Sequence, residues 1–206
     1  MRFWGFWLVV WLGSLAFGDV CSSAFYPTKP ELRWRYRDLT NNQIYTQTFV
    51  RTGPDTLLEQ RYFSERTETT LWTCTPQGLR TLPQGEFPIP GGSVRATKLT
   101  GVVIPSDETW RIGGRWSYRY ELKGRIAVFE LSGYLEVENR IVAKETISVA
   151  AGRFEALRVE ASFRGELGIS FGGRATYWFA EGVGVIKQVS EGSFGGQSSE
   201  LISFGR

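Results

Sequence analysis

The sequence of 206 residues contains no histidine. Histidine is the usual general base beside a catalytic serine and the commonest metal-binding side chain. Its absence excludes a Ser-His-Asp triad and the zinc sites built on imidazole. The chain has only two cysteines, Cys21 and Cys74, and no glycine-rich loop of nucleotide-binding spacing. We therefore expect no metal, no cofactor and no enzymatic activity.

The chain also lacks a strong excess of charge, since its formal net charge is only +3. Nucleic-acid-binding domains concentrate basic charge, so nucleic acid is not an expected partner. Arg33, Arg35 and Arg37 alternate along one predicted strand face. They could pair with glutamates across a sheet or meet an anionic partner. The near balance of charge favours the first interpretation.

A long apolar run occurs at the start of the chain. Residues 1–18 begin with the basic Arg2, continue as an apolar stretch and end in small residues. This order predicts a secretory signal peptide cleaved before Asp19. The apolar run is shorter than the ~20 residues that a membrane-spanning helix needs. An uncleaved membrane anchor is the alternative to a cleaved signal peptide. Residues 19–206 are then expected to form one exported domain.

Two roles are open for Cys21. A lipoprotein signal needs a small residue directly before the cysteine and an aliphatic one three positions before it. Val20 and Asp19 both fit this pattern poorly. Disulfides persist in the oxidising compartments that exported proteins reach. We therefore expect a Cys21–Cys74 disulfide, which would close a loop of about fifty residues and contribute about 4 kcal/mol.

Almost the whole exported part alternates between apolar and polar residues. Such alternation occurs over 32–37, 116–123 and 157–164 and predicts strands with one face on a core. Glycine and proline signals recur between these segments, including Lys123-Gly124 and Gly172-Gly173, which we interpret as turns. The fold class predicted is all-β: a curved antiparallel sheet forming a barrel or half-barrel.

A faint internal repeat suggests two similar halves in this one domain. Residues 31–49 and 113–131 each place a Trp-x-Tyr pair on a strand, followed by a polar turn and a second β-rich segment. Both are expected to form hairpins that pack aromatic side chains into a shared core.

The stretch Gly168-Ile-Ser-Phe-Gly172 matches the G-x-S-x-G pattern of serine hydrolases. Without histidine, Ser170 has no partner for the usual mechanism, and the residues after Gly172 predict a strand rather than a helix. We interpret the stretch as a strand with small residues on one face, and a serine hydrolase is only a remote alternative.

Aromatic residues are abundant and spread over the predicted strands. A curved sheet with an aromatic concave face can hold an apolar ligand. The candidate ligand-binding residues are Trp34, Tyr36, Trp116, Tyr118 and Trp178. The alternative is that they form an ordinary aromatic core.

Three phrases resemble a known group of proteins: residues 110–118, residues 147–159 and residues 177–187. Their order is similar to that of TapB-like bacterial secreted proteins and related exported domains of unknown function, although Ala150 stands where the group's phrase has proline. More distantly, the group is similar to half-barrel carriers of lipoproteins and lipids in the bacterial envelope. The resemblance implies a location in the periplasm, at the cell envelope or outside the cell.

The functional expectation is a non-catalytic exported protein that binds an apolar or lipid-like ligand in its curved sheet. Its partner would be a lipid or a lipid-modified protein. The alternative is a structural or assembly protein that contacts another envelope protein through a sheet edge or the arginine row.

Overall fold

The structure is a computed structural model that describes residues 21–89, 91–193 and 195–206. The predicted signal peptide, residues 1–18, lies outside the described residues. The described chain contains one short 3-10 helix, Asp107–Thr109, and otherwise consists of strands and their connections. The strands are β1 Arg33–Asp38, β2 Ile44–Arg51, β3 Thr56–Tyr62, β4 Thr67–Thr75, β5 Gly78–Arg80, β6 Phe87–Ile89, β7 Gly92–Gly101, β8 Ile104–Pro105, β9 Arg115–Ile126, β10 Phe129–Val149, β11 Gly152–Leu167, β12 Ile169–Ala180, β13 Gly184–Gly192 and β14 Gln197–Gly205.

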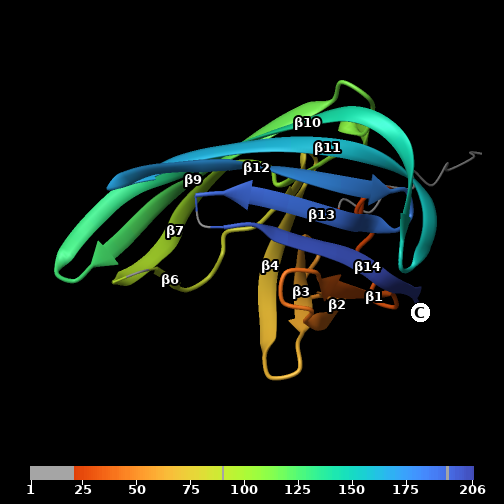
Figure 1. Cartoon of the computed structure of the whole chain (residues 1–206), viewed down its shortest axis with the longest axis horizontal. Helices are drawn as coiled ribbons and strands as arrows, with labels where there is room; N and C mark the ends of the chain where they lie inside the picture. The colour runs from red at the N-terminus through yellow and green to blue at the C-terminus, as the bar shows by residue number, and fades with distance from the viewer. Residues whose placement is uncertain (1–20, 90, 194) are drawn as a thin grey trace, which may run out of the picture.

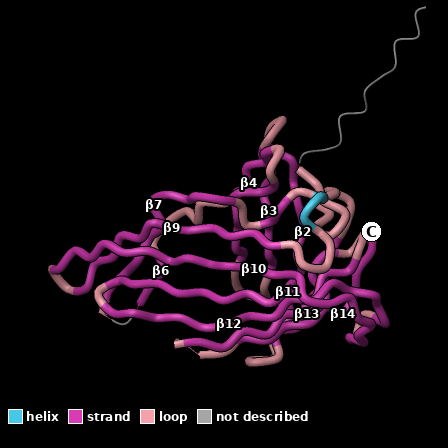
Figure 2. The backbone as a smooth tube through the Cα atoms, turned by 90° about the horizontal axis from the view of Figure 1, so that it is seen from above, coloured by secondary structure: helices cyan, strands magenta, loops and turns pink. Residues whose placement is uncertain are grey.

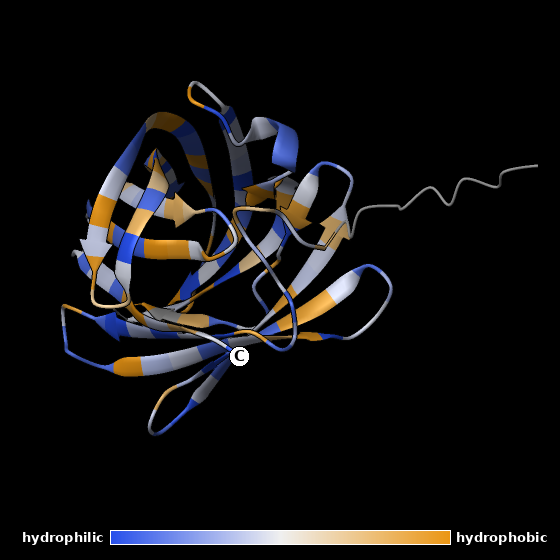
Figure 3. Ribbon diagram, turned by 90° about the vertical axis from the view of Figure 1, so that its right-hand side faces the viewer, coloured by the Kyte–Doolittle hydropathy of each residue, from blue (hydrophilic) through white to orange (hydrophobic). Residues whose placement is uncertain are grey.

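All these strands belong to one antiparallel sheet. Its order is β6-β7-β9-β10-β11-β12-β13-β14-β1-β2-β3-β4-β5-β8. The described strands at its two ends, β6 and β8, do not pair with each other, so the sheet curls into a half-barrel without closing (Figures 1 and 3). The prediction of a curved all-β antiparallel sheet is confirmed.

The first and last strands of the domain are neighbours within the sheet. Strand β1 pairs with β2 on one side and with the last strand, β14, on the other, where Trp34 lies opposite Phe204. This pairing joins β1–β5 to the group of long strands β9–β14. The two segments with the Trp-x-Tyr pattern form hairpins β1–β2 and β9–β10, which lie in different parts of the sheet.

The main core lies where β1–β4 cross the concave side of the long strands, in the right-hand half of Figure 1. The side chains of Trp34, Phe49, Leu57, Ile186 and Leu201 are almost completely buried there. The observed alternation explains this core, because the apolar residues of each strand point inward and their neighbours point to solvent.

Two of the predicted turns are wrong. Lys123-Gly124 lies within β9, which reverses only at Ala127-Val128, and Gly172-Gly173 lies within β12. At Gly173 the neighbouring strands approach so closely that an added Cβ would collide with the Glu191 carbonyl oxygen and the Phe163 ring. Glycine therefore permits close packing at this position rather than a reversal.

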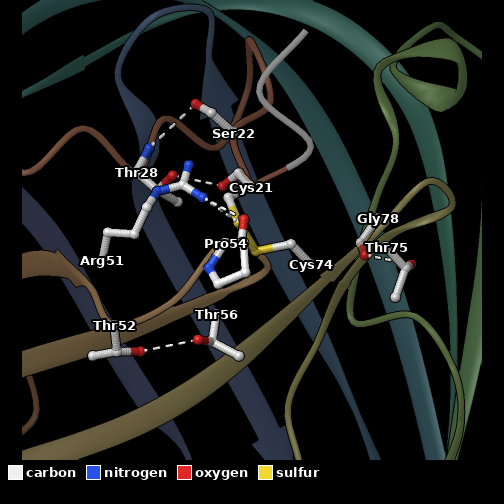
Figure 4. The surroundings of a disulfide bond; sticks show 10 residues. All are labelled: Cys21, Ser22, Thr28, Arg51, Thr52, Pro54, Thr56, Cys74, Thr75 and Gly78. Carbon is white, nitrogen blue, oxygen red and sulfur yellow. Dashed lines mark hydrogen bonds between the residues drawn. A yellow bond between two sulfur atoms is a disulfide. The ribbon is translucent and has the colours of Figure 1, made fainter. Parts of the chain in front are cut away.

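The disulfide expected between Cys21 and Cys74 is present, with Cα atoms 4.9 Å apart (Figure 4). It attaches the first described residues to β4. The Arg51 guanidinium donates hydrogen bonds to the Pro54 carbonyl oxygen at 3.0 Å and to Cys21 Sγ at 3.2 Å. Because its sulfur is bonded to Cys74, Cys21 is not free to carry the thioether-linked lipid of a lipoprotein.

Candidate apolar cleft

The long strands extend beyond the part of the sheet that β1–β4 cover. Figures 1 and 2 show the far ends of β9–β12 reaching to the left, away from β1–β4. The alternation of apolar and polar residues continues to the far end of each strand. The inward-facing residues at these ends are therefore still apolar. No second layer of the described chain covers them, so this alternation leaves apolar surface at the open end of the half-barrel.

This surface forms a cleft of about 660 Å³. Its floor and walls come from five strands of the open end, β7 and β9–β12, with β6 at the rim. The apolar residues that shape it include Val94, Leu122, Leu131, Leu135, Leu167 and Phe171. Small-molecule sites in proteins have volumes of about 300–1,000 Å³ and mostly apolar walls. The cleft therefore has the size and lining of a site for an apolar ligand.

Polar groups are few in the cleft. Tyr120, at its inner end, donates a hydrogen bond from its hydroxyl to the Thr81 carbonyl oxygen at 2.9 Å. Burial raises the pKa of Tyr120 to about 12, so this hydroxyl stays protonated near neutral pH. Among the described lining residues, Arg95 carries the one charged side chain, and it is exposed. Arg95 lies opposite Lys123, next to the cleft-lining Leu122, so its side chain points to the outer face of the sheet. The interior of the cleft itself is apolar and suits an apolar or lipid-like molecule.

The strand-to-strand turn at Gly168 positions one wall. Gly168 has a φ of +76° and connects β11 to β12, so it lies at a chain reversal rather than within the strand expected from the GISFG pattern. The residues around it, Leu167, Ile169 and Phe171, line the cleft. Ser170 lies on the opposite face of β12 and is exposed, as its position in the alternation predicts.

The predicted ligand-binding aromatics do not come together at this cleft. Trp34 and Tyr36 are buried in the main core, where they donate hydrogen bonds to the carbonyl oxygens of Val183 and Val185 at 2.6 and 2.8 Å. Burial raises the pKa of Tyr36 well above its ordinary value. Trp34 thus holds β1 to the residue that precedes β13, and Tyr36 holds it to the start of β13.

The other three predicted aromatics occupy three different positions. Trp116 packs against Trp110 and donates a hydrogen bond to the Val103 carbonyl oxygen at 3.0 Å. Tyr118 packs edge-on against Tyr120, the tyrosine at the inner end of the cleft. Trp178 donates a hydrogen bond to Glu145 Oε1 at 2.6 Å and lies beside the Lys187 ammonium, opposite the inward-facing Phe179.

Sequence reasoning missed the aliphatic residues that build the cleft, although a signal for them was present. Leu122 continues the predicted alternation of β9, and Leu167, Ile169 and Phe171 form an apolar row around the Gly168 turn. The missing information was which part of each apolar row stays uncovered.

A buried polar cluster lies in the main core, away from the cleft. The Glu59 carboxylate is 1 % exposed and accepts hydrogen bonds from Tyr26 Oη at 3.2 Å, Trp72 Nε1 at 2.9 Å and Arg61 Nε at 2.6 Å. Burial and the Glu59 charge raise the pKa of Tyr26 well above its ordinary value. Burial alone would lower the pKa of Arg61, but Glu59, together with Tyr45 and Tyr26, outweighs this effect and the pKa is raised. The cluster holds the N-terminal segment to β3 and β4.

The expected ion pairs of the arginine row are not formed. In the described part of the chain, Arg33, Arg35 and Arg37 make no ion pair. The β14 residues opposite Arg33 and Arg35 are Gly205 and Ser203, which offer no carboxylate, and Arg37 lies opposite Glu200 without forming an ion pair with it. The prediction of cross-strand ion pairs is therefore wrong, although Arg37 does have a glutamate as its cross-strand neighbour.

Two further properties concern the described residues alone. They contain no group of histidine, cysteine or acidic side chains placed to hold a metal ion. No helix among them is long and apolar enough to cross a membrane.

The fold and the cleft define an open all-β half-barrel with an apolar groove at one end. Within this class, residues 130–193, from the start of β10 to just beyond β13, match the model of a family described as DUF3108-like. This match includes two of the three phrases that carry the sequence resemblance. No curated protein matches the chain.

Two solved structures are similar to this one. The first is a protein inferred to be exported, with a YmcC-like fold, from Bacteroides fragilis: it is 11% identical, with a TM-score of 0.53, over 90% of this chain and 100% of that one. The second, inferred to be a lipoprotein, comes from Parabacteroides distasonis and is 10% identical, with a TM-score of 0.51, over 90% and 99% of the chains. At these identities the likeness shows the fold alone.

Proposed function

We propose that this protein is an exported, non-catalytic component of the cell envelope that binds an apolar or lipid-like ligand in the cleft. The observation that carries the proposal is the cleft itself, whose described lining is almost entirely apolar at a volume of about 660 Å³. Burying an acyl chain there would remove apolar surface of both ligand and protein from water, which stabilises the complex by about 25 cal/mol per Å².

Three observations support export. Residues 1–18 have the sequence of a signal peptide, and the Cys21–Cys74 disulfide suits an oxidising compartment. The two similar structures are of proteins inferred to be an exported protein and a lipoprotein. The resemblance to TapB-like proteins rests on the sequence phrases and stays a prediction. Periplasm, envelope surface and extracellular space all fit these observations.

The distribution of polarity narrows the ligand class. The inner part of the cleft offers the Tyr120 ring, and the rest of its lining offers mostly aliphatic side chains. A molecule with an apolar tail and a polar head suits such a cleft, because the tail is buried against apolar side chains and the head stays hydrated outside it. Lipids and the acyl chains of lipid-modified proteins belong to this class.

The experiment combines native mass spectrometry with a blocked cleft. Protein purified from its own host is expected to carry an extractable lipid, and the apo protein is expected to bind a fluorescent fatty-acid probe. Ala96→Trp, on the cleft wall, would fill the site and weaken probe binding about tenfold or more. Val189→Trp, an exposed position on β13 outside the cleft, serves as the matched control. A clean apo mass together with equal probe binding by both variants would contradict the proposal.

A second candidate function, assembly with another envelope protein, is favoured by the arginine row. Arg33 and Arg35 are exposed on β1, and their charges are not neutralised by ion pairs within the described chain. An acidic partner surface would complement them. Crosslinking in intact cells separates the two functions: a specific protein partner that is lost in Arg33→Ser/Arg35→Ser, with no lipid bound, favours assembly.

A further inference from the structure

The cleft end of the molecule exposes large apolar side chains at its chain reversals. In the β9–β10 turn Val128 is 84% exposed, and the next residue, Phe129, is 70% exposed. Ile169, directly after the Gly168 reversal of β11–β12, is 68% exposed. Both hairpins end on the same side of the molecule, at the left of Figures 1 and 2. We call Val128, Phe129 and Ile169 the apolar tip.

The β9–β10 turn departs from ordinary turn chemistry. A two-residue hairpin turn normally uses glycine, asparagine or aspartate where a positive φ is needed. Here Ala127 adopts a φ of +51°, and its N–H donates a hydrogen bond to the Gly91 carbonyl oxygen at 3.2 Å. The following residue is the apolar Val128. Departures from local preference are expected where function needs a particular side chain.

Basic side chains stand behind this tip. Lys123 and Arg125 are exposed on β9, and Arg95 lies beside Lys123 on β7. None of the three forms an ion pair with a described residue, although Glu130 faces Arg125 across the hairpin. Arg125 precedes the turn by two residues, about 7 Å along the strand. Apolar groups that enter a bilayer by about 5–10 Å would place these cations at the level of the headgroups.

We propose that the apolar tip docks on a lipid bilayer and opens the cleft toward it, an inference that rests on the proposed ligand-binding function. Ile169 belongs to both the tip and the cleft lining, and Ile126, which lies opposite Phe129 in the β9–β10 hairpin, also lines the cleft, so both hairpin ends adjoin it. An acyl chain could therefore enter the cleft without crossing water. A hairpin end is too small and convex for a stable protein interface, which needs about 800 Å² on each partner, whereas a bilayer needs no matching shape.

The test measures co-flotation of the full exported domain with phosphatidylglycerol-containing vesicles. Val128→Ser/Phe129→Ser is expected to lower vesicle partitioning about tenfold or more, because two large apolar groups no longer leave water. Val50→Ser/Leu71→Ser removes two apolar side chains of 44% and 42% exposure from β2 and β4, and its partitioning is expected to equal that of the wild type. Lys123→Gln/Arg125→Gln should weaken binding severalfold, and less at high salt.

Affinity for a soluble fatty-acid probe, measured without vesicles, separates this inference from the proposed function. The tip variant is expected to keep its probe affinity. If the wild type binds no probe but the tip variant still binds vesicles more weakly than the wild type, the docking surface is upheld and the proposed function is overturned. Equal flotation of tip and control variants would overturn the docking surface. So would a wild-type dimer that the tip variant converts to monomer, since the tip would then contact a second copy.

Discussion

At the scale of single residues, Glu59 shows how a charge is accommodated in this core. Its carboxylate accepts three hydrogen bonds, one from Arg61 and two from the buried Tyr26 and Trp72 side chains. A buried carboxylate is tolerated only when it is paired and hydrogen-bonded in this way. The three donors come from separate segments, so the cluster specifies how the N-terminal segment, β3 and β4 meet.

Removing this carboxylate should destabilise the fold strongly. Glu59→Ala leaves the Tyr26 hydroxyl and the Trp72 N–H buried without an acceptor, and the expected loss is about 3 kcal/mol of unfolding free energy. Urea unfolding followed by tryptophan fluorescence measures it. Glu68→Ala, which removes the exposed partner of Arg66, is the control and should change stability by less than about 0.5 kcal/mol. Equal losses in the two variants would show that the cluster contributes nothing special.

The sequence predicted which side chains face inward more reliably than it predicted whether they bind a ligand or pack in the core. Alternation assigned Trp34 and Tyr36 to the inner face correctly, and the structure places both in the core. Their binding role stays a prediction. Glu59 could not be recognised, because a carboxylate on an apolar face is explained only by donors that are distant in sequence, such as Tyr26.

At the scale of elements, the β9–β10 turn should trade stability against membrane affinity. Ala127→Gly/Val128→Ser supplies the residues that such a turn prefers and removes the cost of a left-handed alanine, about 1 kcal/mol. We expect a higher unfolding free energy by about that amount and weaker vesicle flotation. Thermal unfolding and flotation of the same preparation measure both. Val128→Ser alone should lower flotation without the gain in stability. If Ala127→Gly/Val128→Ser were more stable but floated as the wild type does, the assigned role of Val128 would be contradicted.

Element boundaries could be predicted only in part, because glycine has two uses in this chain. Gly168 reverses the chain with a positive φ, whereas Gly173 lies within a strand where neighbours leave no room for a side chain. A glycine in the sequence does not show which of the two uses applies, so the turns expected at Lys123-Gly124 and Gly172-Gly173 were wrong. The pairing partners decide between them, and these partners are distant in sequence.

At the scale of the whole molecule, the disulfide joins the first described residues to the sheet across a sequence separation of 53. Cys21→Ser/Cys74→Ser is expected to lower the unfolding free energy by about 4 kcal/mol, since the unfolded chain regains the entropy of that loop. Unfolding of the oxidised protein, the reduced protein and the double variant measures it. The reduced protein and the double variant should agree. An oxidised protein no more stable than either of them would contradict the prediction.

The open end of the half-barrel was beyond prediction from the sequence. Strands β9–β12 carry mainly apolar residues on their inner face at both ends, with the buried Asn139 of β10 between them, and we find no signal in the residues of the open end that marks where β1–β4 stop covering the strands. Coverage depends on the β1–β14 pairing, which joins the two ends of the domain. Fold class could be predicted because it follows from alternation, whereas the cleft follows from the path of the sheet.

Because the core and the cleft are separate, one isoleucine should contribute to stability and another to ligand binding. Ile186, at 0% exposure, belongs to the main core, and Ile169 belongs to the cleft and lies outside that core. The same change to alanine should therefore lower stability at Ile186 and probe affinity at Ile169. Ile186→Ala is expected to cost about 3 kcal/mol of stability and leave the probe affinity of the folded protein unchanged. Ile169→Ala should change stability by less than about 0.5 kcal/mol and weaken probe binding severalfold.

Chemical unfolding and probe titration on the same two preparations make the comparison. The reasoning assumes that the open end contributes little to folding because its apolar groups are already partly hydrated in the folded state, so truncating them removes little buried surface. If Ile169→Ala were as destabilising as Ile186→Ala, the far ends of β9–β12 would be part of the folding core. The apolar surface there would then be required for stability, and its exposure could no longer be attributed to a ligand.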